Sequence, residues 1–341
     1  MFEGKKILIT GGTGSLGQAL TKRLLDEKVD TIRIFSRNEE KQVLMQNNFN
    51  DKRLRFLLGD INDFERLVRA LEDIDIVFHA AALKHVPKIE YNPFEAIKTN
   101  VIGSQNVINA CLHGNVERAI AIGTDKAVSP LNTYGATKLL MEKLFVTANN
   151  YINPERHRTK FIAFRYGNVF GSSGSVVPIF VNQINKKQKL TITDPNMTRF
   201  SITMNEALDF ILNATKYGKG SEIFVPKMRS YNIMDVVETL QNLMGDYGYE
   251  IIGIRPGEKL HEVLINEDEI RQTWEYNDMY LISSPLYSTF HGKEITDNYQ
   301  NITKITNLEN YSSAMSKKIS KDELKNMITN MQGYNKNDQI N

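Results

Sequence analysis

The stretch Thr10-Gly11-Gly12-Thr13-Gly14-Ser15-Leu16-Gly17 decides the fold. It follows the short apolar run Ile7-Leu8-Ile9 and precedes a helical pattern, so Gly11, Gly14 and Gly17 lie at an expected turn from strand to helix. At such a turn a diphosphate can approach free backbone N–H groups and the positive end of a helix dipole. A tight glycine turn that binds nothing has the same local sequence, so the wider pattern decides between the two.

The first half of the chain alternates short apolar runs with longer amphipathic ones, which is typical of parallel strands covered by crossover helices. We expect an α/β fold with a doubly wound, parallel Rossmann sheet. The expected strands are residues 6–10, 31–35, 54–58, 74–79, 118–122 and 160–164, with helices such as 16–28 and 94–113 between them. A glycine loop that opens this series favours dinucleotide binding over an empty turn.

The periodicity loosens after Arg165 into a glycine- and serine-rich segment, residues 167–178. We predict a dinucleotide-binding Rossmann domain over residues 1–166, to which about 203–225 return with a helix at 205–216 and a strand at 222–225. Residues 167–202 and 226–285 are expected to form a smaller α/β substrate domain. Residues 286–341 then form a C-terminal extension.

The composition narrows the class of partner. The 341 residues carry 42 basic and 40 acidic side chains, so the formal net charge is +2, without the basic excess of a nucleic-acid binder. Cys111 is the one cysteine and has apolar neighbours, which excludes an intramolecular disulfide and fits a reducing compartment. No stretch approaches the ~20 apolar residues of a membrane helix. We expect a cytoplasmic protein whose partner is a small molecule, with neither nucleic acid nor membrane as partner.

The second strand end bears on the choice of cofactor. NAD-selective sites usually place an acid there, whereas this chain has Ser36-Arg37, and Arg37 with Lys41 could pair with a 2'-phosphate. This favours NADP, although Arg37 could also be an ordinary solvated cation. Asp60 could reach the adenine amino group or cap a helix. The other candidate cofactor contacts follow the first, third and fourth strands: Thr13, Ser15, Leu16, Ile61, Ala80, Ala81 and Ala82.

A candidate catalytic pair follows the fifth strand. Tyr134 and Lys138 are four residues apart, so both project from one face of the expected helix. An ammonium beside the phenol lowers the tyrosine pKa, and the phenolate can take a hydroxyl proton while hydride leaves the same carbon. Thr124 can hydrogen-bond that hydroxyl. The alternative is a plain surface Tyr–Lys pair, which the order of glycine loop, hydroxyl residue and pair along the chain argues against.

Six further motifs occur along the chain: Ala80-Ala81-Ala82-Leu83-Lys84-His85-Val86-Pro87, Glu90-Tyr91-Asn92-Pro93, Thr124-Asp125-Lys126, Arg165-Tyr166-Gly167-Asn168-Val169, Met197-Thr198-Arg199-Phe200 and Arg255-Pro256-Gly257-Glu258-Lys259. With them the sequence resembles the extended short-chain dehydrogenase/reductases, a family of nucleotide-sugar enzymes. The resemblance is closest to the inverting UDP-N-acetylglucosamine 4,6-dehydratases. It covers residues 2 to about 285.

The resemblance implies a lyase that uses NADP without consuming it. The C4 position is oxidised, water is eliminated across C5–C6, and hydride returns to C6. Inversion at C5 gives UDP-2-acetamido-2,6-dideoxy-L-arabino-hexos-4-ulose. By similarity Lys126 is the base at C5, which demands a neutral amine and a lowered pKa, and Asp125 is the acid for the 6-hydroxyl, with a raised pKa. Relatives that retain configuration have glutamate at the position of Lys126. Without the resemblance, Asp125 and Lys126 would be interpreted as a structural turn with a solvated ion pair.

The resemblance also implies where the substrate binds. Arg199 and Arg255 resemble the arginines that meet the diphosphate, and Glu258 resembles the residue that holds the uridine ribose. The remaining candidate substrate contacts are Lys84, His85, Asn168 and Val176. Many relatives have Arg-Gly-Ser where this chain has Ser173-Gly174-Ser175, which removes one possible contact. His85 lacks obvious ligand partners, so no metal site is expected.

Three alternatives stay open. A UDP-sugar 4-epimerase shares the Tyr–Lys pair but returns hydride to C4 and has no use for Asp125 with Lys126. A configuration-retaining 4,6-dehydratase is the second. An NADP-sensing regulator with a degenerate site is the third, and intact Tyr134 and Lys138 argue against it. The resemblance further implies a homo-oligomer, because helices packed across a symmetry axis are normal in this family.

Overall fold

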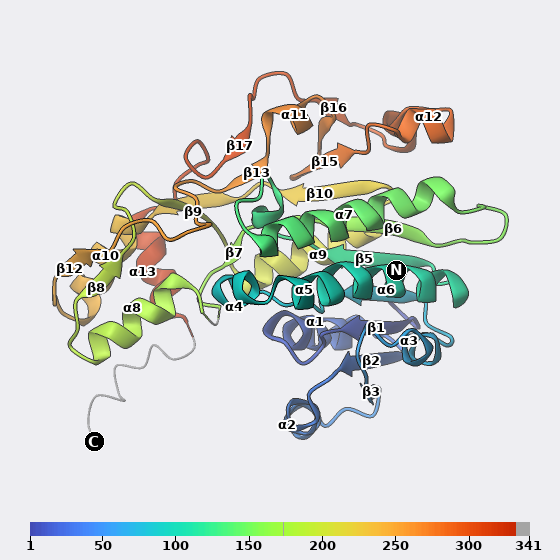
Figure 1. Cartoon of the computed structure of the whole chain (residues 1–341), viewed down its shortest axis with the longest axis horizontal. Coiled ribbons are helices and arrows are strands. Elements are labelled where there is room, and N and C mark those ends of the chain that lie inside the picture. The colour runs from blue at the N-terminus through green and yellow to red at the C-terminus, as the bar shows by residue number, and fades with distance from the viewer. Residues whose placement is uncertain (173, 332–341) are drawn as a thin grey trace.

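The computed structural model describes residues 1–172 and 174–331 (Figure 1). Its centre is a ten-stranded sheet in the order β16-β14-β15-β10-β6-β5-β4-β1-β2-β3. The strands from β10 to β3 are mutually parallel, and their bounds are β1 Lys6–Thr10, β2 Thr31–Ser36, β3 Leu54–Leu58, β4 Ile76–His79, β5 Arg118–Ile122, β6 Lys160–Phe164 and β10 Glu222–Pro226. The expected Rossmann sheet is confirmed. Its inner strands β1, β4, β5, β6 and β10 are almost entirely buried, as strands covered on both faces are, whereas the edge strand β3 is partly exposed.

Helices cover both faces of this sheet (Figure 1). On one face lie α1 (Ser15–Asp26) and α9 (Met204–Tyr217), which contact each other. On the other lie α3 (Phe64–Ala70), α6 (Gly103–His113) and α7 (Thr133–Tyr151). The short helix α2 (Glu39–Phe49) contacts β2 and β3. The return of residues 203–225 to this domain is therefore observed as α9 and β10.

The expected helix over residues 94–113 is interrupted. It consists of α5 (Pro93–Ile97), a π-helical turn (Lys98–Ile102) and α6. The π turn carries buried Asn100, whose amide accepts from Leu83 N (2.8 Å) and donates to Leu83 O (3.0 Å). A π turn widens a helix locally, and here it lets Asn100 hold the loop that follows β4.

A second hydrophobic core lies beside the first and includes Val181, Leu190 and Val237. It is built from α8 (Val176–Asn185), β8 (Leu190–Ile192), α10 (Ile233–Met244) and α13 (Lys321–Thr329). The strand β12 (Tyr249–Ile251) pairs in parallel with β8. A three-stranded sheet of β7 (Asn168–Val169), β9 (Thr198–Ile202) and β11 (Arg229–Asn232) lies between the two cores.

The C-terminal part differs from the expected domain boundaries. The strands β15 (Met279–Ser283), β14 (Thr273–Tyr276) and β16 (Thr303–Lys304) extend the main sheet beyond β10 in antiparallel register, so residues 273–283 do not belong to the smaller domain. This pairing satisfies the edge of β10, which would otherwise be exposed. The extension also returns as β17 (Tyr311–Ser312), which pairs with β13 (Val263–Ile265), and as α13 on α10.

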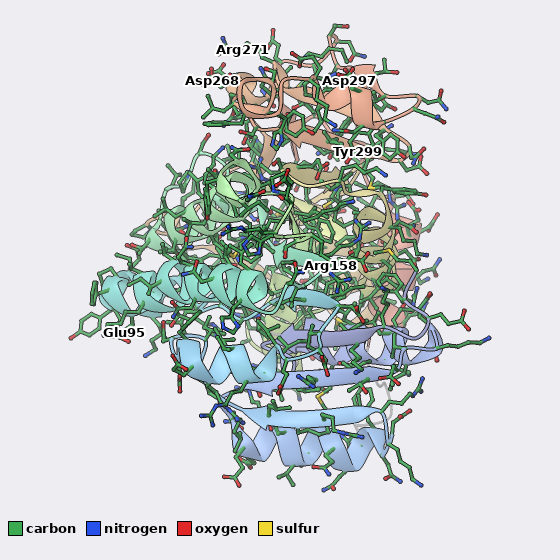
Figure 2. All side chains as sticks on the ribbon, turned by 90° about the vertical axis from the view of Figure 1, so that its right-hand side faces the viewer. Glu95, Arg158, Asp268, Arg271, Asp297 and Tyr299 are labelled. Atoms are coloured by element: carbon green, nitrogen blue, oxygen red, sulfur yellow. The ribbon has the colours of Figure 1, made fainter. Side chains whose placement is uncertain are left out.

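One buried contact ties this C-terminal segment to the main sheet. Tyr299 Oη donates to Glu222 Oε1 (2.6 Å) at the start of β10. Figure 2 shows Asp268, Arg271 and Asp297 at the top of the molecule and Tyr299 below them. Asp268 lies on α11 (Glu267–Ile270), and Asp297 on a 3-10 turn (Ile295–Asn298) that follows α12 (Tyr287–His291). The extension is thus packed against the Rossmann domain as well as against the second core.

Two further observations concern the described residues alone. None of their helices combines the length and hydropathy of a membrane span. Nor do three or more His, Cys, Asp or Glu side chains among them gather as metal ligands. Cys111 is fully buried in α6, and this burial raises the pKa of its thiol.

Candidate active site

The glycine loop has the shape of a phosphate cradle. Gly11 has φ +67°, and a Cβ there would lie 2.8 Å from the backbone of Ala81, in the loop after β4. A Cβ on Gly17 would lie 2.5 Å from Gly12 O, so only glycine lets α1 start this close to β1. Gly14 is the N-cap of α1 and brings no capping side chain. The first N–H groups of α1 are therefore available to an anion, and the loop fits a dinucleotide diphosphate.

The other candidate cofactor residues lie at the same edge of the sheet. β2, β1 and β4 are neighbours and run parallel, so Ser36, Ile61 and the alanines after β4 follow strands that end together. Arg37 Nη1 lies 3.3 Å from Asp60 Oδ2. Asp60 Oδ1 accepts from Asn62 N (2.9 Å) in the turn before α3, whose N-cap is Asp63, so Asp60 does not cap this helix. Arg37 is 58% exposed at this edge, and Lys41 is exposed on α2, so neither cation is buried away from a ligand.

The helix α7 carries the candidate catalytic pair, Tyr134 and Lys138. Its N-cap is Asn132, whose side chain accepts from Gly135 N (2.8 Å). Gly135 lies so close to Lys126 O that a Cβ would be 2.1 Å away, which presses the start of α7 against the turn after β5. Lys138, one helical turn after Tyr134, is buried, and its Nζ donates to Ile122 O (2.7 Å). Burial lowers the pKa of Lys138 to about 7.

The pKa of Tyr134 differs from expectation. Burial raises it, the charge of Lys126 lowers it, Asp125 raises it again, and contact with Thr124 lowers it. The net pKa is above that of a free phenol. Lys138 donates to the end of β5, at Ile122 O, and the effect expected of it on the phenol stays a prediction.

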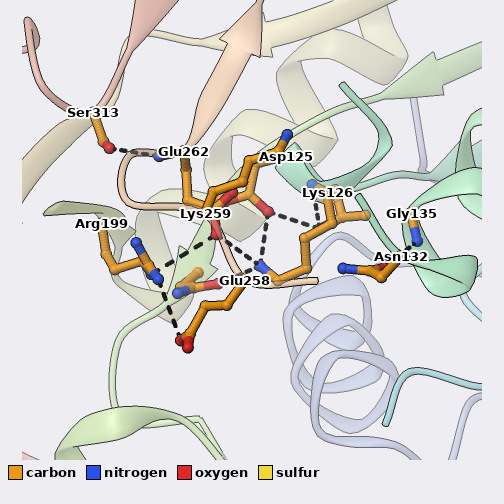
Figure 3. A network of polar contacts seen from close by, with 12 residues as sticks. Asp125, Lys126, Asn132, Gly135, Arg199, Glu258, Lys259, Glu262 and Ser313 are labelled. Atoms are coloured by element: carbon orange, nitrogen blue, oxygen red, sulfur yellow. Dashed lines mark hydrogen bonds and ion pairs between the residues drawn. The ribbon is translucent and has the colours of Figure 1, made fainter. Parts of the chain in front are cut away.

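A network of charged side chains surrounds Lys126 (Figure 3). Asp125 and Lys126 lie on a 3-10 turn (Asp125–Ala127) directly after β5. Lys126 Nζ donates to Asp125 Oδ1 (3.0 Å) and to Asn168 Oδ1 (3.2 Å) and lies 3.7 Å from Glu262 Oε1. Thr124 Oγ1 donates to the same Asp125 oxygen (3.0 Å). Asp125 is fully buried, so the network is a built feature of the site rather than a solvated turn.

The charge state of Lys126 is the reverse of the expected one. Burial by itself lowers the pKa of the amine, but the charges of Asp125 and Glu262 outweigh burial. The net pKa is raised above that of an ordinary lysine, so Lys126 is an ammonium in this arrangement. The sequence expectation of a lowered pKa is wrong for the protein without substrate, because a second carboxylate packs against the amine.

Arg199 connects this network to the smaller domain. Its Nη1 donates to Thr198 O (2.8 Å) and Leu260 O (3.1 Å), while Nη2 lies 3.4 Å from Glu258 Oε1. Its Nε lies 3.7 Å from Glu262 Oε1. Arg199 and Glu258, both expected to bind the nucleotide, therefore form an ion pair with each other. Glu262 lies between Arg199 and Lys126 and so links this pair to the Lys126 network.

Four further substrate candidates lie on other segments. Arg255 is exposed, and its backbone N–H donates to Glu258 Oε2 (3.4 Å). Lys84 and His85 are exposed on the loop before α4 (Val86–Tyr91), and Val176 begins α8. Within the part of the chain that the structure describes, the side chains of these four residues have no hydrogen bond or ion pair to the network. Ser173 lies outside the described residues.

The sequence reasoning missed two charged residues of the site. Glu262 is buried between Lys126 and Arg199, and Lys259 donates from Nζ to Val128 O. Lys259 is the last residue of the motif that begins at Arg255, and Glu262 follows three residues later. One feature of the sequence could have indicated the role of Glu262. It is an acid directly before the apolar run Val263-Leu264-Ile265, which forms the strand β13.

The fold and the Tyr134–Lys138 pair are those of an extended short-chain dehydrogenase/reductase. Residues 7–284 match the polysaccharide biosynthesis protein family, and the chain belongs to this family. It is 50% identical over 285 residues to UDP-N-acetylglucosamine 4,6-dehydratase (inverting) from Campylobacter jejuni, covering 83% of this chain and 84% of that protein. It is 39% identical over 336 residues to a UDP-glucose 4-epimerase from Rickettsia bellii, covering 97% of each. The solved structure of Pen from Bacillus thuringiensis has a TM-score of 0.87 and 41% identity, covering 97% of this chain and 99% of that one.

Proposed function

We propose that the protein is an inverting UDP-N-acetylglucosamine 4,6-dehydratase. The observation that carries this proposal is the Asp125–Lys126 pair (3.0 Å) on the turn after β5, beside the helix that carries Tyr134. An epimerase needs only a proton acceptor at C4, whereas elimination across C5–C6 needs a second acid–base centre. The 50% identity to the UDP-N-acetylglucosamine 4,6-dehydratase (inverting) from Campylobacter jejuni supports the same function.

We assign to the side chains the roles that the family resemblance implies. Tyr134 takes the proton of the 4-hydroxyl, and Thr124 orients that hydroxyl. Lys126 removes the C5 proton and passes it to Asp125, 3.0 Å away, and Asp125 delivers it to the leaving 6-hydroxyl, so that the elements of water leave from C5 and C6. Asn168, which accepts from Lys126 (3.2 Å), holds the amine in place. The nicotinamide ring, when bound, supplies the hydride acceptor for C4 and the hydride donor for C6.

We propose NADP as the cofactor, bound by the glycine loop and the loops after β2, β3 and β4. The cradle at Gly11 supports a dinucleotide of either kind. The exposed Arg37, with no acid at the end of β2, supports a 2'-phosphate over a 2'-hydroxyl. Asp60 holds this guanidinium at the edge of the adenosine site, 3.3 Å away, from where it can turn to the phosphate.

The smaller domain binds the UDP part of the substrate. Arg199 and Arg255 meet the diphosphate, and Glu258 meets the uridine ribose. For this, Glu258 exchanges its contact with Arg199 for one with the nucleotide, which its part-exposed position allows. Lys84, His85 and Val176 line the approach of the sugar.

We also propose a homo-oligomer. The helices α4, α5 and α7 and the π turn contact one another and leave large apolar side chains exposed, namely Tyr91, Phe94, Ile97, Ile102 and Leu140. An exposed apolar patch on packed helices fits a second copy of the chain. Light scattering of the purified protein tests this, and a monomer at micromolar concentration contradicts it.

Incubation with UDP-N-acetylglucosamine tests the activity. Mass spectrometry should show a product that has lost one water, and proton NMR should show a 4-keto-6-deoxy sugar. The epimerase alternative has its own support in the relative from Rickettsia bellii. An unchanged mass with a changed C4 configuration would favour it and overturn the dehydratase proposal.

A further inference from the structure

Lys126 has to lose a proton before it can act as a base. In the structure it lies between two carboxylates, Asp125 at 3.0 Å and Glu262 at 3.7 Å. Both stabilise the ammonium, so the resting site is in the wrong protonation state for elimination. A binding event must therefore move a proton off the amine, and the structure offers a specific acceptor for it.

Glu262 is placed to receive this proton. Its Oε1 lies 3.7 Å from Lys126 Nζ and also 3.7 Å from Arg199 Nε, so one oxygen is shared by the two cations. Its Oε2 is buried and has no hydrogen-bond partner among the described residues. Ser313 fixes the backbone on both sides, since Ser313 Oγ accepts from Glu262 N (2.9 Å) and Ser313 N donates to Glu262 O (2.8 Å). The carboxylate is thus held between the two cations.

We propose that Glu262 takes the Nζ proton of Lys126 when the diphosphate of the substrate engages Arg199, so that substrate binding converts Lys126 into a neutral base. This proposal rests on the proposed function, which brings a diphosphate to Arg199. One N–H bond of the ammonium breaks and one O–H bond forms on Glu262. Both groups become neutral, and the proton returns when the diphosphate leaves.

The direction of the transfer follows from where the new charge arrives. The diphosphate adds negative charge at Arg199, which lies 3.7 Å from Glu262 Oε1 and, among the described residues, has no ion pair with Asp125. A proton that moves from Lys126 to Glu262 therefore moves towards the added negative charge, which is favourable. Transfer to Asp125 would move it the other way. This distinguishes Glu262 from the nearer carboxylate.

The other charged groups around Glu262 fit the same direction. Asp125, Lys126, Arg199 and Lys259 face it, and the pKa of Glu262 is already raised, first by burial and then by Asp125, against the three cations. Tyr134 and Tyr231 complete the titratable neighbours of Lys126. Pairing Arg199 with a diphosphate weakens one of the cations that hold Glu262 ionised, so its proton affinity rises further.

Single-turnover kinetics of Glu262→Gln test this relay against a purely electrostatic role. The variant should still oxidise C4, followed by nicotinamide absorbance, but should eliminate water at neutral pH about 10- to 100-fold more slowly. Its elimination rate should climb with pH as solvent takes over the deprotonation of Lys126. A carboxylate that only raised the pKa of Lys126 would give the opposite result, faster elimination in the variant. An unchanged or faster rate overturns the proposal.

Glu258→Gln is the matched control. Glu258 also contacts Arg199 (3.4 Å), but within the described residues it has no contact with Lys126. Its loss should change the KM for the UDP sugar while leaving the ratio of elimination to C4 oxidation as in the unmodified enzyme. If the two variants behave alike, Glu262 acts through substrate binding alone, and the relay is excluded.

Calorimetry with UDP supplies a readout that needs no turnover. Titrations in buffers of different ionisation enthalpy count the protons taken up on binding. At a pH high enough to keep Glu262 of Lys126→Met ionised before UDP is added, Glu262 has to draw its proton from solvent, so uptake should exceed that of the unmodified protein and return to it in Lys126→Met with Glu262→Gln. Equal uptake in the unmodified protein and Lys126→Met overturns the relay, even where the double variant does not fold. Absence of dehydration by the unmodified enzyme would instead overturn the proposed function.

Discussion

Arg165 and Glu142 form an ion pair in which neither side chain is exposed, with 2.5 Å between Arg165 Nη2 and Glu142 Oε1. The pair joins the residue after β6 to the middle of α7, the helix that carries Tyr134. Glu269 of α11 adds a second carboxylate, 2.8 Å from Arg165 Nη1. One guanidinium therefore fixes the catalytic helix to the sheet and to the C-terminal part of the chain.

Arg165→Met should destabilise the protein strongly. The substitution leaves the carboxylate of Glu142 buried without its cation, and breaking a buried pair in this way costs about 3–5 kcal/mol. Urea unfolding of the variant measures the loss. Adding Glu142→Gln to the variant removes the unpaired charge and should recover part of it. A loss below about 1 kcal/mol would show that water or another cation reaches Glu142.

Tyr134→Phe should lose most of the turnover. The phenol oxygen is the proposed acceptor of the 4-hydroxyl proton, and loss of a general base typically costs about 10² to 10⁴ in rate. Binding of the UDP sugar, measured by calorimetry, should survive because the ring remains. Tyr166→Phe, a buried neighbour on the motif after β6, is the control and should keep far more activity. Near-normal turnover in Tyr134→Phe would remove this residue from the chemistry.

Glu222 should make stability fall as pH rises through the weakly acidic range. Burial raises the pKa of this carboxyl to about 7, against hydrogen bonds from Tyr299 and the backbone. Its unfolded value is near 4.5, so between these two pH values the folded state holds more protons than the unfolded one. The free energy of unfolding contributed by Glu222 should therefore decrease by about 3 kcal/mol across the window.

Urea unfolding of the unmodified protein and of Glu222→Gln at pH 5 and pH 7.5 isolates this contribution, because the amide does not titrate. Comparison of the two proteins is needed because buried His79 changes the free energy of unfolding with pH in the opposite direction. Burial lowers the pKa of His79 to about 3, so its contribution rises with pH. Exposed Glu72, replaced by Gln, is the control. A difference between the unmodified protein and Glu222→Gln that is independent of pH would contradict the assignment.

Arg37→Ala should weaken the binding of NADP and leave the binding of NAD little changed. A charge-assisted contact to the 2'-phosphate is worth about 1.5–3 kcal/mol, which corresponds to roughly 10- to 100-fold in affinity. Arg55→Ala, on β3, removes another exposed arginine and serves as the control. Fluorescence titration of the reduced cofactors measures both affinities. Equal affinities for the two cofactors in the unmodified protein would contradict the choice of NADP.

The inner strands of the Rossmann sheet could be predicted because burial on both faces makes them short and mostly apolar. Four of the six expected strands, from residues 6, 54, 118 and 160, have the observed bounds. The fourth strand begins two residues later than expected, at Ile76, because the carboxylate of Asp75 accepts a hydrogen bond from Lys6 N (3.0 Å). β14 and β15 were missed because they continue the sheet in antiparallel register after a long excursion into the smaller domain. The local periodicity of the sequence does not show that the chain returns to the main sheet.

The candidate site was predictable to the extent that it is local. Tyr134 and Lys138 share a helical face, and Asp125 adjoins Lys126, so spacing alone brings these pairs together. The charge on Lys126 was not predictable, since it depends on Glu262, which arrives from the distant segment before β13. A pKa expected from the role of a residue is unreliable where an unforeseen carboxylate sets it.

Lys126 should determine the configuration at C5. Relatives that retain configuration resemble this chain up to Thr124-Asp125 but have glutamate at the next position, so a different base adjoins the same carbon. We expect the proton lost from C5 to be replaced from the opposite face, with solvent deuterium appearing at C5 and the hydrogen at C6 coming from C4 of the same sugar. Proton NMR of the product formed in heavy water checks both parts at once. A D-xylo configuration at early times would refute inversion and leave dehydration intact. Lys126→Glu is the companion variant: a switch to the retained product would identify Lys126 as the stereochemical determinant, whereas undiminished inversion would remove it from the mechanism.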